Sequence, residues 1–514
     1  MSDVLMSDDL PKAFFDMVPQ RAVRVTTFPR GIPQNAIWDF IRTPKARFFF
    51  SLCAEGSVAA SGQLHEYDPA SGHTRLCFDL EKVCMVGPRA IPPSKIHTSM
   101  DNMPDGRIIM ATHSTAPAPS HPYWLFDAYY SHLWEGFAGS HLLIYDPSNR
   151  DVRNLGVPVP HESIYGGLYD ARHEAYYAIG YCRGHLYRHD LRSSTTRDMG
   201  QVSEFGSYRL SHGPDGHIYG TTRTGWIYRI DVDKQRVVDL RVQLPKHPSL
   251  PRRTQYVSGA IGPDGRLYMI NHVSDQLAAL DVKSGRLEVL GTCDPGPVVP
   301  KLYPRCPIGL AFDDAGVLWY AFQSWSHLVR WDVLRGGQPE CMGLLGTLKR
   351  STAFCSEIIF DRGALHIADT CHAEDPPMIL RVDLRALKRA ASAPRRKTLD
   401  PYAYVLLGDG RTAFSGRARD MAPYYRNVEV GKVAQELYAR NTYTIQAEET
   451  RVVRLWHSVP VDESSVQRLR WVDNRTLQGV CGATRRRAFT WSLDSGLILF
   501  KAAAAKIPEP SGLA

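Results

Sequence analysis

Residues 264–281 read DGRLYMINHVSDQLAALD, and this pattern returns along most of the chain. A turn of the Asp-Gly type opens an apolar strand, a short loop follows, and a second apolar strand ends on an aspartate. Short apolar runs bounded by turn residues are typical of buried β-strands. A sequence that repeats such a unit indicates a repeat architecture, in which each copy buries its apolar faces against its neighbours.

The first strand of this pattern occurs seven times, as ARFFFSLC (46–53), DGRIIMATH (105–113), HEAYYAIGY (173–181), DGHIYGTTR (215–223), DGRLYMINH (264–272), AGVLWYAFQ (315–323) and RGALHIADT (362–370). The next strand ends each time on an aspartate, at Asp68, Asp146, Asp190, Asp231, Asp281, Asp332 and Asp383. Most of these aspartates are 41 to 51 residues apart, the length of a four-stranded blade. The sequence therefore predicts an all-β fold, a seven-bladed β-propeller over residues 35–388.

The segments outside the repeats are predicted less directly. Residues 1–34 form an N-terminal segment, and residues 389–514 a C-terminal extension that closes or caps the propeller. Blade-like strands return at 465–496 and one helix is expected at 430–441, so an eighth blade is the alternative to a cap. The aromatic and proline-rich insertion at 114–140 is either a self-packed surface loop or a lid over a pocket.

Composition narrows the function classes. The 514 residues are 44% hydrophobic and 22% charged, with a net charge of +8 spread along the chain, which fits an anionic ligand and does not indicate nucleic acid. We find no apolar run long enough to span a membrane and no signal peptide in the acidic N-terminus. The ten cysteines are scattered without a CxxC pair, so we expect a cytoplasmic protein without a disulfide framework.

Propeller geometry places two sets of side chains at one rim of the central channel. The innermost strand of each blade runs antiparallel to the second, so its start lies beside the end of the second strand. The innermost strands begin near His97, Tyr165, Arg209, Tyr256 and Glu357. The second strands end near His113, Cys182, Arg183, Arg223, His272, Gln323, Asp369 and His372. This rim is rich in histidine, tyrosine and arginine, most densely in blades 2 to 5.

These residue types suit β-elimination next to a uronate carboxylate. An arginine neutralises the carboxylate so that the weakly acidic C5 proton can leave, and Arg183 or Arg223 is suited to this. A histidine or tyrosine removes that proton, and another returns one to the leaving oxygen. His97, His113 and Tyr165 are the candidates for these two steps.

The stretch KIHTSMDNMPDGRIIMATHS and the later GSHLLIYDPSNRDVRNLGVPVPHESIYGGLYDARHEAYYAIGYCRGHLYRHDL resemble the propeller lyases that act on ulvan and the related rhamnose-glucuronate lyases. The resemblance covers roughly residues 90–232. It implies catalytic roles for His97, His113, Tyr165 and Arg183, with Tyr181 or Arg188 as alternatives to Arg183. It also places Arg223 near a substrate-binding position.

We expect Arg209, Tyr256 and His272, from the same rim, to bind substrate together with Arg223. Without the secretion signal usual for this family, the expected substrates are anionic oligosaccharides or small glycosides, and polymer degradation is in doubt. No cofactor is required for this reaction.

Two other classes compete with the lyase. A metal-dependent lactonase-like hydrolase or isomerase would need a divalent cation on the propeller axis. Its ligands would be either Glu357, Asp369 and Asn271 or the histidines His97, His113, His272 and His372. A non-catalytic scaffold that binds a protein partner on the same face is the third class, because propellers host many functions.

Overall fold

A computed structural model describes most of the chain between residues 17 and 390 and four strands near the C-terminus. The description leaves out residues 1–16, 55–59, 88–89, 115–136, 182, 204–208, 246–255, 272–275, 294–306, 323–326, 347–354, 370–375 and 391–465, the links between the C-terminal strands, and 501–514. The chain divides into two compact units, and residues 17–295 with 305–394 form the larger one. Among the described residues, no helix is long and apolar enough to cross a membrane.

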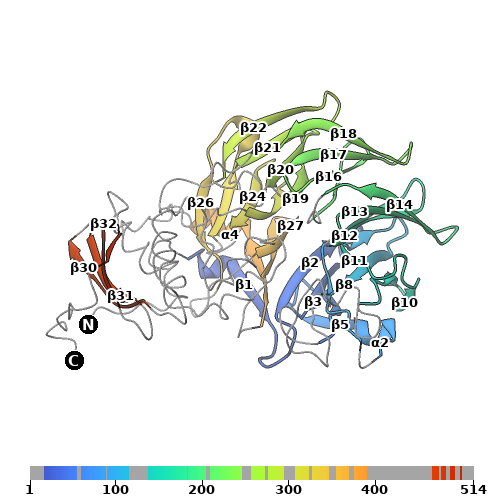
Figure 1. The fold of residues 1–514 in the computed structure, drawn as a ribbon, viewed down its shortest axis with the longest axis horizontal. Coiled ribbons are helices and arrows are strands. Elements are labelled where there is room, and N and C mark those ends of the chain that lie inside the picture. Colours follow the sequence, from blue (N-terminus) through green and yellow to red (C-terminus); the bar gives the residue numbers. More distant parts are fainter. Residues whose placement is uncertain are drawn as a thin grey trace. The chain divides into compact units, whose positions relative to one another are not determined.

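The larger unit is a seven-bladed β-propeller, as the repeats predicted. Its described strands form seven antiparallel sheets that follow one another in chain order (Figure 1). Blade 1 consists of β2 (Ala36–Arg42), β3 (Phe48–Cys53), β4 (Gln63–Tyr67) and β5 (Thr74–Asp79). Blade 2 consists of β6 (Lys95–Ile96) with β7 (Asp101–Asn102), β8 (Ile108–His113), β9 (Leu142–Asp146) and β10 (Asp151–Asn154). Blade 3 consists of β11 (Ser163–Asp170), β12 (Ala175–Tyr181), β13 (His185–Asp190) and β14 (Thr195–Gln201).

Blades 4 to 6 repeat the same order. Blade 4 consists of β15 (Ser211–His212), β16 (Ile218–Thr221), β17 (Trp226–Asp231) and β18 (Arg236–Gln243). Blade 5 consists of β19 (Tyr256–Ile261), β20 (Leu267–Asn271), β21 (Gln276–Asp281) and β22 (Arg286–Thr292). Blade 6 consists of β23 (Pro307–Phe312), β24 (Leu318–Phe322), β25 (His327–Trp331) and β26 (Glu340–Leu344). The first strand of each blade is the innermost. Short helices η1 (Gln20–Ala22), α2 (Leu80–Cys84), η2 (Val333–Arg335) and α4 (Leu384–Ala390) lie between or beside the sheets.

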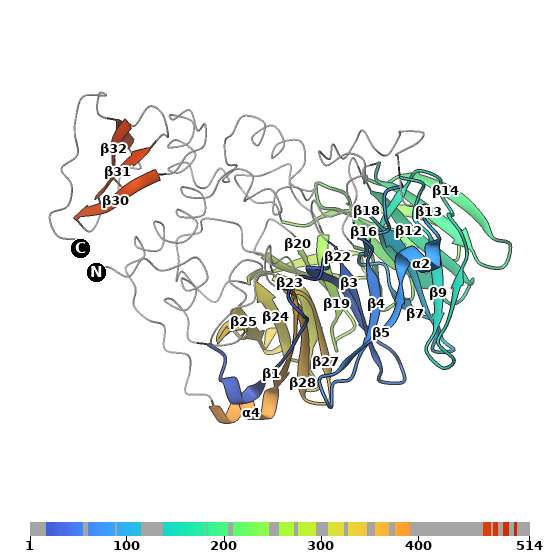
Figure 2. The same cartoon turned by 90° about the horizontal axis from the view of Figure 1, so that it is seen from below.

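Blade 7 is built from both ends of the propeller. Its inner strands are β27 (Cys355–Asp361), β28 (Ala364–Asp369) and β29 (Met378–Asp383), and β1 (Val23–Thr27) pairs antiparallel with β29 as the fourth strand. The short helix η1, directly before β1, lies beside α4 (Figure 2). A strand from the predicted N-terminal segment thus closes the ring.

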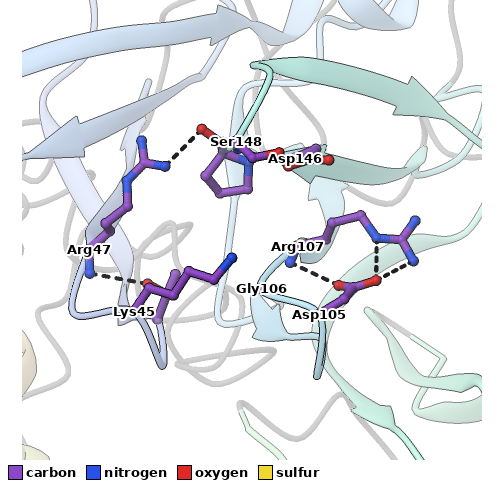
Figure 3. Close-up of a pocket in the computed structure, with 9 residues that line it drawn as sticks. Lys45, Arg47, Asp105, Gly106, Arg107, Asp146 and Ser148 are labelled. Carbon is purple, nitrogen blue, oxygen red and sulfur yellow. Dashed lines mark hydrogen bonds and ion pairs between the residues drawn. The ribbon is translucent and has the colours of Figure 1, made fainter.

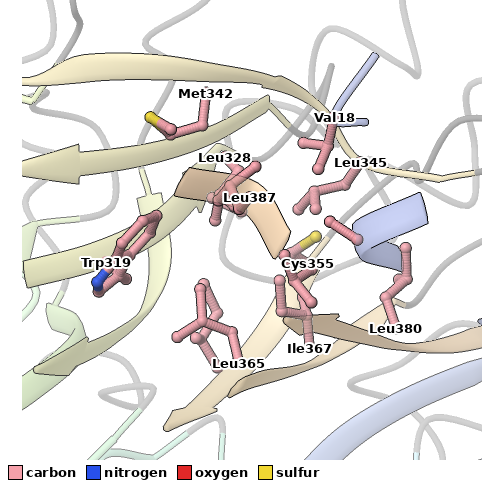
Figure 4. Close-up of a cluster of buried hydrophobic side chains, with 14 of the residues drawn as sticks. Val18, Trp319, Leu328, Met342, Leu345, Cys355, Leu365, Ile367, Leu380 and Leu387 are labelled. Carbon is pink, nitrogen blue, oxygen red and sulfur yellow. The ribbon is translucent and has the colours of Figure 1, made fainter. Parts of the chain in front are cut away.

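Each pair of neighbouring blades is joined by a cluster of buried hydrophobic side chains, including the pair formed by blades 7 and 1. Successive residues of a strand point to opposite faces, so a strand between two blades must be apolar on both. In β24, for example, Leu318 and Tyr320 face blade 5, whereas Trp319 faces blade 7. Figure 4 shows the cluster between blades 6 and 7. This double burial explains the uninterrupted apolar runs of the repeat.

The aspartate that ends each repeat is a turn residue. The Asp190 carboxylate accepts hydrogen bonds from the backbone N–H groups of Arg192 and Ser193, and the Asp281 carboxylate accepts them from Lys283 and Ser284. Such side-chain bonds stabilise a tight turn between two strands. Five of the seven signature aspartates thus have a structural role at an outer hairpin, whereas Asp332 precedes η2 and Asp383 precedes α4.

The C-terminal strands lie in the smaller unit. There β30 (Val466–Asp473), β31 (Thr476–Cys481), β32 (Arg487–Ser492) and β33 (Ile498–Phe500) form one four-stranded sheet, where blade-like strands were predicted. The ring itself has seven blades, so the eight-bladed alternative is not the observed fold. The predicted helix at 430–441 lies outside the described residues, as does most of the insertion at 114–140. The capping role of 389–514 stays a prediction.

Candidate functional site

Three predicted catalytic side chains meet where blades 2 and 3 adjoin the central channel. The ring centroids of His97 and Tyr165 are 3.9 Å apart, and His113 lies 4.9 Å from Tyr165 and 5.6 Å from His97. Tyr181, an alternative for the fourth position, stacks on Tyr165 at 4.9 Å. Trp38 of blade 1 stacks on the other side of the group, 4.6 Å from His97. We call these five residues the aromatic cluster.

Irregularities in the inner strands aim these side chains at one another. The inner strand of blade 2 is interrupted between Ile96 and Asp101, and His97 lies in this break. Tyr165 is the extra residue of a β-bulge in β11, and Trp38 lies in a second bulge in β2. A bulge bends a strand and re-aims a side chain that the regular pleat would direct elsewhere. Residues of three blades therefore converge instead of alternating between faces.

Hydrogen bonds orient the two imidazoles. The His113 Nδ1 atom lies 2.7 Å from Ser163 Oγ, and His97 Nδ1 lies 3.4 Å from Thr98 Oγ1. The Nε2 atoms of both rings are buried and have no hydrogen-bond partner in the part of the chain that the structure describes. In the tautomer whose Nδ1–H group donates this hydrogen bond to the hydroxyl, the basic lone pair of the neutral imidazole lies on Nε2. Both rings have a nitrogen available for proton transfer.

Burial and neighbouring cations keep both histidines neutral. Burial lowers the pKa of His97 well below its usual value; a proton on His113 would lower it further, and the charges of Lys95 and Arg209 do so. Burial, with the charge of Lys95, also lowers the pKa of His113. Lys95 faces His113 across the strand pair β6–β8, and its ammonium group lies 5.9 Å from the centroid of the Trp38 ring. The site thus combines neutral bases with a buried cation.

The aromatic cluster is closed to solvent in this conformation. His97, His113 and Tyr165 are each at most 1% exposed, and Tyr181 is 2% exposed. A saccharide can reach the histidines only if atoms that cover them are displaced. The cluster has the composition of a catalytic site and the packing of a core.

The predicted arginines are not part of the cluster. Arg183 is exposed in the turn that follows β12, and Arg223 follows β16, where its backbone N–H donates to Ser203 Oγ at 2.8 Å. Arg209 of blade 4 reaches blade 7, where its guanidinium forms an ion pair with Glu357 and donates to the backbone oxygen of Ser356 at 3.1 Å. Burial raises the pKa of Glu357 in spite of this pairing. The guanidinium of Arg209 is therefore already paired with the carboxylate of Glu357.

Other predicted residues are described only in part. Tyr256 begins β19, but only its backbone is described, and His272 lies outside the described residues, as does His372. Within the described ranges, one group of histidine and acidic residues is close enough to hold a metal ion: His217, Asp231 and Asp233 of blade 4. It lies at the turns at the opposite ends of the strands from the aromatic cluster. The predicted axial metal stays a prediction.

Sequence reasoning missed four residues at or beside the cluster: Trp38, Asp39, Lys95 and Ser163. Lys95 could have been identified from the sequence, because strand alternation places it on the same face as His97. Ser163 precedes Tyr165 by two residues in the same strand and is explained in the same way. Trp38 and Asp39 come from another blade and depend on a bulge that no local pattern indicates.

A separate small pocket lies between blades 1 and 2, at the end of the strands opposite to the aromatic cluster. Its volume is about 210 Å³, and Lys45, Arg47, Arg107, Asp105 and Ser148 are among the residues that line it (Figure 3). Arg107 pairs with Asp105 at 2.6 Å, and Arg47 pairs at 2.6 Å with Glu66. Two of its three cations are thus neutralised by carboxylates of the chain.

Comparisons with known proteins identify no family for this chain. No family model matches the sequence, and no curated protein matches it. Among solved structures, virginiamycin B lyase from Staphylococcus aureus is 13% identical, with a TM-score of 0.49, over 70% of this chain and 99% of that one. The WD40 repeats of RRP9 are 11% identical, with a TM-score of 0.47, over 72% of this chain and 99% of that one. YCF48 bound to D1 peptide is 13% identical, with a TM-score of 0.44, over 72% of this chain and 98% of that one. None of these three likenesses assigns a family or a function to this chain.

Proposed function

We propose that this chain is a carbon–oxygen lyase that cleaves a glycosidic bond to a uronic acid by β-elimination, acting on oligosaccharides or small glycosides in the cytoplasm. The observation that carries the proposal is the convergence of His97, His113 and Tyr165 within 5.6 Å, at the rim where inner-strand starts and second-strand ends meet. Histidine and tyrosine side chains in mutual contact can remove one proton and supply another.

The proposed reaction needs two proton transfers. The Nε2 atom of His113 or His97 takes the C5 proton, the C5–H electron pair forms the C4=C5 double bond, and the C4–O bond breaks. The Tyr165 hydroxyl then gives its proton to the leaving oxygen, and the enzyme returns to its first state by passing a proton from histidine to tyrosine. The low pKa of each histidine means that little of it is protonated before the reaction, because burial disfavours the imidazolium.

The substrate carboxylate must be neutralised during this step. Lys95, a buried cation beside both histidines, supports the proposal, because positive charge near the C5 carbanion stabilises it. Arg183 and Arg223, which were predicted to neutralise this carboxylate, are not part of the cluster, and we propose instead that they bind outer parts of the saccharide. The burial of the cluster requires that the rim opens when the substrate binds.

The first test is an assay with a panel of uronate-terminated oligosaccharides. A lyase releases a 4,5-unsaturated uronate, which absorbs in the ultraviolet, and we expect His113→Ala and Tyr165→Phe each to lower kcat at least about a hundredfold. His366→Ala and Tyr219→Phe are matched controls, since His366 is equally buried in blade 7 and the Tyr219 hydroxyl binds Asp215 at 2.8 Å in blade 4. No unsaturated product from any member of a broad panel would refute the proposal.

A protein-binding scaffold is the second candidate, favoured by the burial of the cluster. If the five aromatic rings are a core that rigidifies the rim, His113→Ala will lower the midpoint of thermal unfolding as strongly as His366→Ala does. Under this alternative, wild-type protein produces no unsaturated uronate. The same set of variants therefore separates the two functions.

A further inference from the structure

The inner strand of blade 2 is broken by the turn 97–100, which carries His97. Thr98 has φ of 44°, in the left-handed region. This conformation is a genuine outlier for a β-branched residue and persists only where surrounding contacts hold it. The position of the His97 ring therefore depends on whatever fixes this turn.

Blade 3 holds one side of the turn. The hydroxyl of Thr98 donates to the backbone oxygen of Tyr165 at 3.0 Å, and the Gly167 N–H donates to the backbone oxygen of Thr98 at 3.2 Å. The Tyr176 hydroxyl donates to the backbone oxygen of Ser99 at 2.6 Å. These contacts tie the turn to the strand that carries Tyr165.

Blade 1 holds the other side through one carboxyl group. The Oδ2 atom of Asp39 accepts hydrogen bonds from the backbone N–H groups of Ser99 at 2.6 Å and Met100 at 2.7 Å. Asp39 is 4% exposed and lies in the same β-bulge as Trp38, the residue that stacks on His97. Two adjacent residues of blade 1 thus fix the turn that carries His97. Asp39 binds the backbone N–H groups of the turn, and Trp38 stacks on the His97 imidazole.

We propose that Asp39 is a positioning residue, whose carboxyl oxygen holds the turn 97–100 and so keeps the His97 ring between Trp38 and Tyr165. Its catalytic consequence rests on the proposed lyase function, but the positioning itself does not. Without this oxygen two buried N–H groups lose their acceptor, and the strained Thr98 can relax toward ordinary strand geometry. The His97 ring then leaves the stack.

The test compares Asp39→Ala with Asp39→Asn, because an amide oxygen at the place of Oδ2 still accepts both hydrogen bonds. Asp313→Ala is the matched control. Asp313 is also buried, and its carboxylate accepts from the backbone N–H groups of Ala315 and Val317 at 2.9 Å, but in blade 6. The readout is the NMR signal of the His97 ring protons, assigned with His97→Gln.

The stacked Trp38 ring should shift those signals upfield in the wild-type chain. We expect Asp39→Ala to lose this shift, whereas Asp39→Asn and Asp313→Ala retain it. If Asp39→Ala does not fold, Asp39→Ser replaces it, because its hydroxyl is too short to reach both N–H groups. An unchanged His97 signal in folded Asp39→Ala or Asp39→Ser would overturn the proposal, as would an equal change in Asp313→Ala.

Activity gives a second readout. If the wild-type chain is a lyase, Asp39→Ala should lower kcat at least tenfold with a smaller change in KM, and Asp39→Asn should restore most of it. If the wild-type chain has no lyase activity but its His97 signal still moves only when the Asp39 oxygen is removed, the proposed function is refuted and the positioning role is supported. An active enzyme whose kcat is unchanged in Asp39→Ala contradicts the positioning role.

Discussion

Burial raises the pKa of two carboxyl groups near the proposed site, those of Glu162 and Asp39. Glu162, directly before Ser163, is 2% exposed, and burial raises its pKa to about 7, although the Tyr187 hydroxyl donates to it at 3.1 Å. Burial also raises the pKa of Asp39 to about 7. An ordinary carboxyl is fully ionised at that pH. Both residues therefore change charge near neutrality, beside histidines that stay uncharged.

Glu162 leads to a prediction about stability and pH. Its pKa in the folded protein, about 7, exceeds the ordinary value of 4.5, so the folded state holds a proton that the unfolded chain has released. The contribution of Glu162 to the free energy of unfolding is then greatest below pH 4.5 and falls as pH rises to about 7. We expect Glu162→Gln to lose less stability between pH 5 and pH 8 than the wild-type chain, as measured by urea unfolding. Exposed Glu340→Gln is the control, and equal pH dependence of both variants would contradict the prediction.

Among the elements, the second and third strands of each blade pair regularly, while the innermost and outermost strands carry the irregularities. The second strands β8, β12 and β28 are buried along their whole length. Bulges or register shifts occur in pairs that the inner strands β2, β11, β19, β23 and β27 form with their second strands. They also occur between the third and outermost strands of blades 1, 3, 4, 5 and 6. The buried middle pair of each blade is thus regular, and the innermost and outermost strands depart from a regular pleat.

The blade interfaces predict the cost of a cavity. Leu365 of β28 is completely buried in the cluster between blades 6 and 7, which also contains Trp319 and Leu380 (Figure 4). Leu365→Ala should lower the free energy of unfolding by about 2–5 kcal/mol, because it loses buried apolar surface and leaves a cavity. Leu76→Ala, at a half-exposed leucine of β5, should cost much less. Similar midpoints of urea unfolding for the two variants would show that this interface is not tightly packed.

At the scale of the whole propeller, the N-terminal strand closes the ring. Residues Val23 to Thr27 pair with β29 along their length, and the neighbouring Val18 and Ala22 belong to the cluster between blades 6 and 7. The last blade thus combines strands that lie more than 300 residues apart in the sequence. Closure of this kind removes an exposed sheet edge and ties the two ends of the repeat array together.

A pair of truncations tests this closure. Removal of residues 1–27 deletes β1, whereas removal of residues 1–16 leaves it in place. We expect the longer truncation to be less stable than the shorter by roughly 3 kcal/mol or more, since it removes the buried Val18 and the partly buried valines of β1 and exposes the apolar side chains that they cover. Equal thermal unfolding midpoints for the two chains would show that the hydrogen bonds between β1 and β29 contribute little.

The seven repeats, the positions of their strands and the rim at which His97, His113 and Tyr165 meet could all be predicted from the sequence, which left an eighth blade open as an alternative. These features follow from local patterns, because a blade is one hairpin-connected unit and its inner-strand start always lies beside its second-strand end. The tertiary structure alone decided that Trp38 and Asp39 complete the surroundings of His97, that Arg209 pairs with Glu357, and that β1 closes the ring. Each of these joins residues of different blades through a bulge, a long side chain or a distant strand, and no short-range pattern records such a contact. Burial of the cluster is likewise a property of the assembled ring.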